Sequence, residues 1–128
     1  SPAVTPPPMP ARVARVLSKI NKHQKTQGFW QISVLSLLRI SVEDATEALP
    51  TVVRGKPLSR EAWATLIMLG VFYKKFKPFQ YQWHQMAVKA RKWLRPVARD
   101  LAPDLDWAFN VNHFITSIRP TAPAPKQK

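Results

Sequence analysis

Apolar residues are densest between Ser59 and Phe76, where the run from Ala62 to Tyr73 contains no charged residue. At helical spacing this run is apolar nearly all round, which is typical of a helix surrounded by protein or lipid. It is too short to span a bilayer, which needs roughly 20 residues. The pattern therefore predicts a central buried helix over residues 59–76.

The ends of this helix carry recognisable signals. Ser59 is expected to be the N-cap, with Leu58 and Trp63 packed together as a hydrophobic staple. Glu61 in the first turn and Lys74 in the last turn suit the helix dipole. These local signals predict that the helix begins at Ser59.

Further helices are predicted by the spacing of apolar residues on either side. Prolines and a glycine separate them, because neither residue continues a helix well. The expected segments are an amphipathic basic helix at 11–25 broken by Gly28, a helix or buried turn at 32–40, a short helix at 42–49 capped by Ser41, a helix at 79–95 ended by Pro96 with a further turn at 97–101, and a last helix at 103–118 with Pro103 as its first residue.

Eight residues on the predicted apolar faces are expected to form the structural core: Trp30, Trp63, Leu66, Ile67, Gly70, Trp83, Trp93 and Trp107. Trp30 follows Phe29 after a glycine, and two other roles compete with a core position for it. It could be an exposed anchor in a partner interface or a ring stacked on a base. Burial is favoured, because Trp is highly buried on average in folded proteins.

Composition supports a single domain of 128 residues with enough apolar content (45%) for a core. The absence of Cys excludes disulfides and thiolate metal sites, and three Gly leave little for hairpins. Proline gathers at the two ends, which predicts extended Pro-rich arms at 1–10 and 119–128 around a helical domain at 11–118. The expected fold class is all-α, a small bundle of about five to six helices around the central one.

The net charge of +13 is unevenly distributed along the chain. No acid precedes Glu43, and none lies between Glu61 and Asp100. One-signed surfaces of this kind favour a polyanion or an acidic protein as partner, with a solvated face as the alternative. Expected contacts are the cations of these stretches and one ring in the aromatic-basic turn around Pro78: Arg12, Arg15, Lys19, Lys22, Lys74, Lys75, Lys77, Tyr81, Lys89, Lys92 and Arg95.

Groups able to carry out catalysis or bind metal are sparse. His23, His84 and His113 fall on three different predicted helices, whereas a metal site needs three or four converging ligands. Asp104 and Asp106 suit the dipole at a helix start. No nucleophile with a base and no Gly-rich phosphate loop is found, so we expect no enzyme, cofactor, metal site or small-molecule substrate.

Five short motifs follow one another in a recognisable order: Gly-Phe-Trp at 28–30, Ser-Val-Glu at 41–43, Pro50, Trp-Ala-Thr at 63–65, and Lys-Ala-Arg-Lys-Trp-Leu-Arg at 89–95. Their order and spacing resemble the small C-terminal domain of proteins with a vault-inter-alpha-trypsin region and a von Willebrand factor A domain. Vault poly(ADP-ribose) polymerase is one relative, and its C-terminal domain binds the major vault protein. The resemblance covers about residues 28–95, and more weakly the chain up to 118. It implies a helical, non-enzymatic docking domain.

Two functions remain as alternatives. The first is an architectural subunit that docks on protein partners within a large assembly. The second is an RNA-contacting structural protein of a ribonucleoprotein, such as an organellar (mitochondrial) ribosome. A membrane-surface role through the first helix explains little else, and no transmembrane segment is expected. We expect an intracellular location, in the cytoplasm or the mitochondrial matrix, because no signal-peptide core is present.

Overall fold

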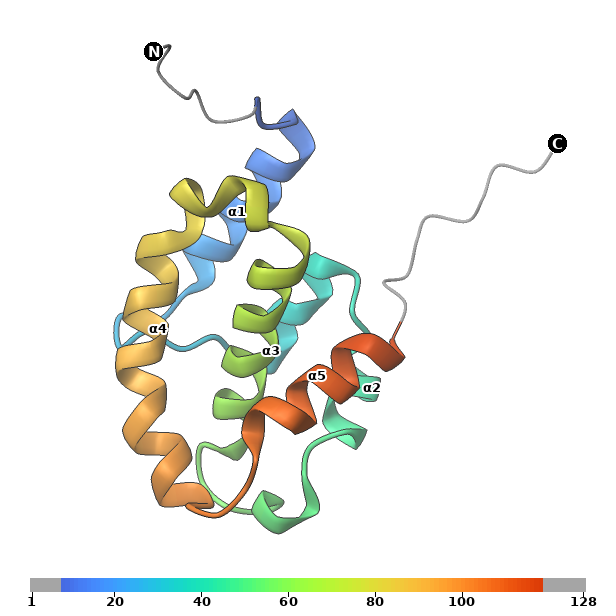
Figure 1. Cartoon of the computed structure of the whole chain (residues 1–128), viewed down its shortest axis with the longest axis vertical. Helices are drawn as coiled ribbons and strands as arrows, with labels where there is room; N and C mark the ends of the chain where they lie inside the picture. Colours follow the sequence, from blue (N-terminus) through green and yellow to red (C-terminus); the bar gives the residue numbers. More distant parts are fainter. Residues whose placement is uncertain (1–7, 119–128) are drawn as a thin grey trace, which may run out of the picture.

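Helix α3 (Ser59–Lys75) runs through the middle of the domain in the computed structural model, which describes residues 8–118 (Figure 1). Ten of its 17 residues are buried, and they lie all around the helix axis. A helix this apolar is stable only where other elements cover it. The prediction of a central buried helix is confirmed.

The described part of the chain contains helices and no strand, so the all-α fold class is confirmed. The predicted segment at 32–40 forms a 3₁₀ helix, and short 3₁₀ turns also precede α3 and α4. Around α3 the elements are α1 (Ala11–His23), η1 (Ile32–Leu38), α2 (Val42–Glu47), η2 (Thr51–Val53), η3 (Lys77–Phe79), α4 (Gln80–Leu101) and α5 (Trp107–Ser117).

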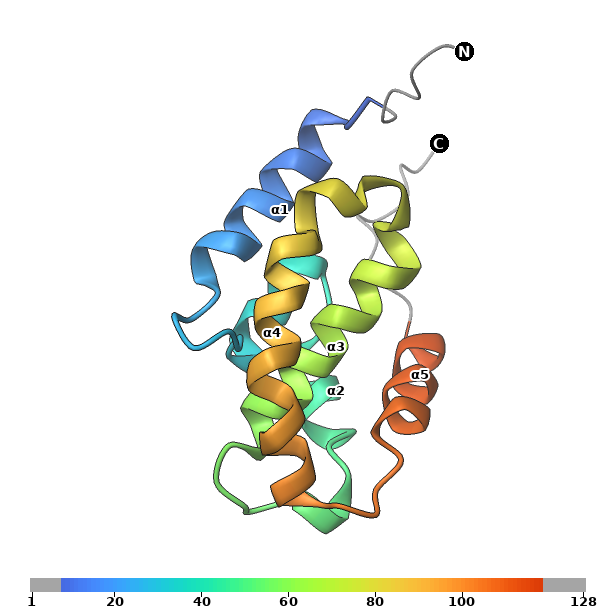
Figure 2. The same ribbon diagram turned by 60° about the vertical axis from the view of Figure 1, so that its left-hand side comes forward.

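Three elements cover the central helix. Helix α4 returns antiparallel to α3, α5 crosses its other side, and η1 packs behind it (Figures 1 and 2). Helix α1 lies beside the first half of α4 and also contacts η1. Met9, in the segment before α1, packs partly buried against the core.

The predicted start of α3 is wrong in its details. Leu58 is the N-cap, with a left-handed backbone (φ +67°), and Ser59 is the first helical residue. The Ser59 N–H donates to the Lys56 carbonyl in the preceding turn, and the Ser59 side chain is buried. No hydrophobic staple forms in the predicted way, because Leu58 is itself the cap and is 45% exposed.

The predicted boundaries around two prolines are also wrong. Helix α4 continues through Pro96 to Leu101. Pro96 removes one main-chain hydrogen bond from α4. The packing of Val97 and Ala98 on the core and the burial of Leu101 stabilise the continued helix and offset this loss. Helix α5 begins at Trp107 rather than at Pro103, because the Asp106 carboxylate accepts from the Phe109 N–H at 3.0 Å and caps it.

Three tryptophans are fully buried at the centre of the core: Trp30, Trp63 and Trp83. Burying an indole N–H without a partner is costly, so each needs an acceptor. Each donates to a main-chain carbonyl, Trp30 to Ile20 at 2.8 Å, Trp63 to Ala45 at 2.9 Å and Trp83 to Phe76 at 2.7 Å. These bonds connect α1, α2 and the end of α3 to the core.

Of the other five residues expected in the core, Ile67 is fully buried. The remaining four are half-buried at the edge of the core: Leu66, Gly70, Trp93 and Trp107. Trp93 packs its ring on Phe29 with centroids 4.8 Å apart. The Trp107 indole nitrogen is buried and has no hydrogen-bond partner within residues 8–118. Gly70 lies against the Val111 and Ile115 side chains of α5.

Candidate interaction surfaces

The cations of α1 are exposed. Leu17 and Ile20 are buried, with Val13 and Val16 half-buried beside them. The opposite face carries the four cations predicted as contacts: Arg12, Arg15, Lys19 and Lys22. Amphipathic spacing explains this arrangement, because the apolar stripe docks on the domain and leaves the charged stripe in water.

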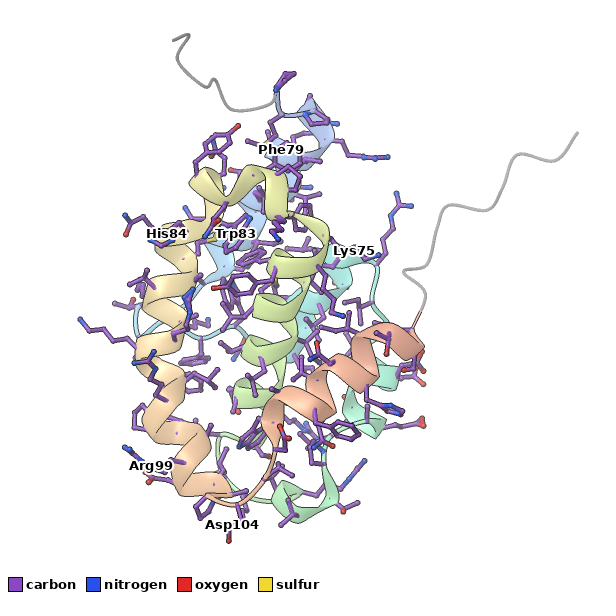
Figure 3. All side chains as sticks on the ribbon, viewed as in Figure 1. Lys75, Phe79, Trp83, His84, Arg99 and Asp104 are labelled. Carbon is purple, nitrogen blue, oxygen red and sulfur yellow. The ribbon has the colours of Figure 1, made fainter. Side chains whose placement is uncertain are left out.

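The predicted aromatic-basic turn lies at the end of the domain where α3 meets α4. Lys74, Lys75 and Lys77 are exposed, and Tyr81 is 49% exposed. Phe79 is half-buried against the core, so this ring is partly used in packing (Figure 3).

Helix α4 presents a row of exposed cations, which we call the α4 stripe: Lys89, Lys92, Arg95 and Arg99. Their spacing of three or four residues places them on the solvent face of the helix. Arg91 is not part of this row. Its guanidinium faces α3, where it donates to the Tyr73 hydroxyl and lies over the Tyr73 ring.

A tight loop joins α1 to the α4 side of the domain. Gln24 donates from Nε2 to the carbonyl of Gly28 at 2.8 Å and to that of Met86 at 3.0 Å. Gly28 lies so close to α4 that a Cβ on it would stand 2.5 Å from the Lys89 carbonyl oxygen. The cations of α1 and the α4 stripe therefore belong to neighbouring helices (Figure 2).

Three of the acids lie toward one end of the domain, where the cation Arg99 also lies (Figure 3). Lys75 at the end of α3 and Asp104 before α5 lie at opposite ends (Figure 3). Glu61 lies at the start of α3 and Asp100 near the end of α4, toward the Asp104 end. The end that holds Lys75 is therefore strongly basic, a distribution that attracts anionic partners.

An apolar groove of about 550 Å³ opens between α1, η1, the end of α3 and the end of α5. Its walls are apolar side chains that converge from these four elements: Val13, Val16, Leu37, Leu38, Ile40, Val71, Phe76, Ile115 and Ile118. Ile40, Val71 and Ile115 are buried, while the remaining six are only half-buried. The groove thus presents apolar surface that residues 8–118 leave uncovered.

Three cations surround this groove, and no acid is among its lining residues. Arg12 comes from α1, Lys75 from the end of α3, and Arg39 from the end of η1. Arg39 adopts a left-handed conformation (φ +59°) that ends η1. Arg12 and Lys75 are among the contacts expected from the sequence and Arg39 is not, although an Arg between Leu38 and Ile40 indicates that the apolar run meets solvent there.

A smaller cavity of about 300 Å³ lies where α2 and the following loop meet the start of α3. Two of its three lining cations have hydrogen-bond partners within residues 8–118. Arg54 donates to the Glu47 carbonyl, and Lys56 donates from Nζ to the Leu101 carbonyl at 2.7 Å. Glu61 adds an opposite charge to the lining. These contacts connect the loop to α2 and α4 and account for Arg54 and Lys56.

Within residues 8–118, no three His, Cys, Asp or Glu side chains lie close enough to hold a metal ion. His113 stacks on Phe109, with ring centroids 6.2 Å apart, and neither His84 nor His113 lines either cavity. In the same part of the chain, no helix combines the length and apolarity needed to cross a membrane.

Searches of family models, of curated proteins and of solved structures find no match for the chain. The resemblance of residues 28–95 to the C-terminal domains of the vault-inter-alpha-trypsin proteins therefore stays a prediction.

Proposed function

We propose that this chain is a non-enzymatic docking subunit of a large assembly, which binds an acidic protein partner through its basic helical domain. The observation that carries the proposal is the apolar groove with Arg12, Arg39 and Lys75 around it. Protein interfaces combine an apolar centre with a polar, charged rim. The groove has this organisation, and its rim carries a single sign of charge.

The charge distribution supports an acidic partner in particular. Complementary charges raise the association rate and reject like-charged competitors. The exposed cations of α1 and the basic end of α3 lie next to the groove, so they add to the field that guides a partner toward it. The resemblance to the vault-inter-alpha-trypsin family supports the same class of function, a helical domain that docks on protein.

RNA is the second candidate, and the α4 stripe favours it. Four exposed cations on the solvent face of one helix suit a row of phosphates. The tryptophans offer little stacking surface, because the Trp93 ring already packs on Phe29 and Trp30 is fully buried. Other rings are exposed, among them Tyr81 (49%) and Phe109 (66%). The RNA candidate therefore rests on phosphate contacts, with these exposed rings as the available stacking surfaces.

Gradient sedimentation from the cells that produce the protein tests the proposal. The full chain is expected to sediment with a large particle and to remain there after RNase treatment. Release by RNase, with affinity falling steeply between about 50 and 200 mM salt, would favour the RNA candidate. Sedimentation of the chain at its own mass would contradict both candidates.

The predicted Pro-rich arms are part of the same proposal, with the arms running over neighbouring chains or RNA. Residues 1–7 and 119–128 lie outside the described part of the structure. A variant without both segments is expected to keep its helical circular dichroism and to incorporate less well into the particle.

A further inference from the structure

We propose that the apolar groove is the docking site for an acidic amphipathic helix of the protein partner. This inference rests on the proposed function and deepens it, because it assigns the site and the kind of segment that occupies it. The argument uses the shape of the groove, its uncovered apolar side chains and the charges around it.

The walls of the groove favour a helical occupant. They come from α1, η1, α3 and α5, and no strand within residues 8–118 offers an edge that an extended peptide could join. A helix in such a groove inserts apolar anchors at i, i+3 or i+4, and i+7. Val16, Leu38 and Ile118 are half-buried on three different walls, and these anchors would complete their burial.

The charges around the groove define the polar flanks of that helix. Arg12, Arg39 and Lys75 come from three separate elements, and the lining carries no acid to neutralise them. Glu or Asp residues beside the apolar anchors would face these cations, whereas Lys or Arg there would be repelled. The occupant is therefore acidic on both sides of its apolar stripe.

The chain's own terminal segments do not match this description. Residues 119–128 follow the groove residue Ile118 but contain three cations and no acid. Residues 1–10 contain no charged side chain. RNA matches poorly for another reason, since phosphates gain nothing from the apolar walls. Charge complementarity thus favours an acidic segment of the protein partner over these two segments.

A synthetic helix can test the assignment on the full chain. The probe is a fluorescein-labelled peptide of about 18 residues with Leu at i, i+4, i+7 and i+11 and Glu on both flanks. Its control has the same composition, with the leucines distributed all round the helix. Fluorescence anisotropy at fixed ionic strength is expected to show binding of the probe and little binding of the control.

Two double variants with the same change in net charge locate the binding. R12E/K75E alters the groove rim, and K89E/K92E alters the α4 stripe. All four side chains are exposed, so circular dichroism should show that both variants fold. The first is expected to weaken probe binding by about ten-fold and the second by less than about three-fold. Methyl NMR of the wild type should place the largest shift changes at Val16, Leu38 and Ile118.

Several results would overturn the assignment. They are equal weakening by the two double variants, equal binding of the two peptides, or methyl shift changes outside the groove. Binding of oleate without binding of the probe would instead assign the groove to a fatty acyl anion.

Sedimentation separates this inference from the proposed function. If wild-type protein sediments at its own mass, the proposed function fails, whatever the peptide does. If wild-type protein and R12E/K75E both sediment with the particle, the docking function stands and the groove is not its site. The expected result is that R12E/K75E leaves the particle while K89E/K92E stays in it.

Discussion

The backbone N–H of Trp30 donates to the side-chain Oγ1 of Thr65 at 3.1 Å, across 35 positions of sequence. Both residues are fully buried, so neither group can use water as an alternative partner. The bond fixes the segment between α1 and η1 against the central helix. The Thr65 hydroxyl therefore serves as the hydrogen-bond acceptor for the Trp30 N–H, which the loop brings into the core beside an otherwise apolar helix.

Replacing Thr65 with Val should destabilise the domain by about 1–3 kcal/mol, because the Trp30 N–H is left buried without an acceptor. Thr65→Ser keeps the hydroxyl and loses a methyl group, so it isolates the packing contribution. Urea unfolding followed by tryptophan fluorescence gives both values. A Val variant as stable as the wild type would show that the hydrogen bond contributes nothing.

Gly28→Ala should be more damaging than Gly55→Ala, although both glycines have a positive φ, +122° and +82°. A Cβ at Gly28 would meet the Lys89 carbonyl oxygen at 2.5 Å, whereas a Cβ at Gly55 would meet nothing within 4 Å. We expect a loss of at least about 2 kcal/mol at Gly28 and about 1 kcal/mol at Gly55. Thermal unfolding of the pair measures the steric contribution, and equal losses would argue against close packing of the loop on α4.

Gly70 allows α5 to approach α3, since a Cβ there would overlap the Cδ1 atom of Ile115. Gly70→Leu is expected to cost about 1–3 kcal/mol by overpacking this contact. Gly70→Ala should be tolerated better when Ile115→Val removes the overlapping methyl group. The double-mutant cycle should show a favourable coupling. Additive effects in chemical denaturation would mean that the two residues do not compete for the same space.

Trp63 and Trp107 form a matched pair, because the indole N–H of the first donates to the Ala45 carbonyl and that of the second has no partner within residues 8–118. Trp63→Phe leaves a buried carbonyl unpaired, whereas Trp107→Phe removes an unsatisfied donor. Trp63→Phe should therefore cost about 1–3 kcal/mol more than Trp107→Phe. The comparison needs equilibrium unfolding by circular dichroism, and the reverse order would refute this account.

Pro96→Ala should stabilise the domain by about 1–3 kcal/mol, because it restores a main-chain donor within α4 and removes the ring that crowds the preceding turn. Pro96 is exposed, so little packing is lost. The midpoint of thermal unfolding should rise. A lower midpoint would indicate that the proline shapes α4 so that Leu101 reaches the core.

Local sequence patterns correctly predicted those features that depend only on residues close together in the chain. The central helix was found because its apolar run is continuous, and the Ser41 cap is confirmed by the bond from the Asp44 N–H to the Ser41 hydroxyl at 3.1 Å. Such a cap spans three residues, so it can be read from the chain itself. The same logic failed at Ser59, since the turn from Lys56 to Leu58 already directs the backbone into the helix.

The all-α class, the buried central helix and the excess of cations follow from the sequence alone, because helical periodicity and charge are properties of short stretches. The continuation of α4 through Pro96 depends on tertiary packing, since the stabilisation comes from burying Leu101 in the core. The groove depends on tertiary structure in the same way. Val16, Leu38, Phe76 and Ile118 lie far apart in sequence, and their apolar side chains share one surface only because packing around α3 leaves them there partly uncovered.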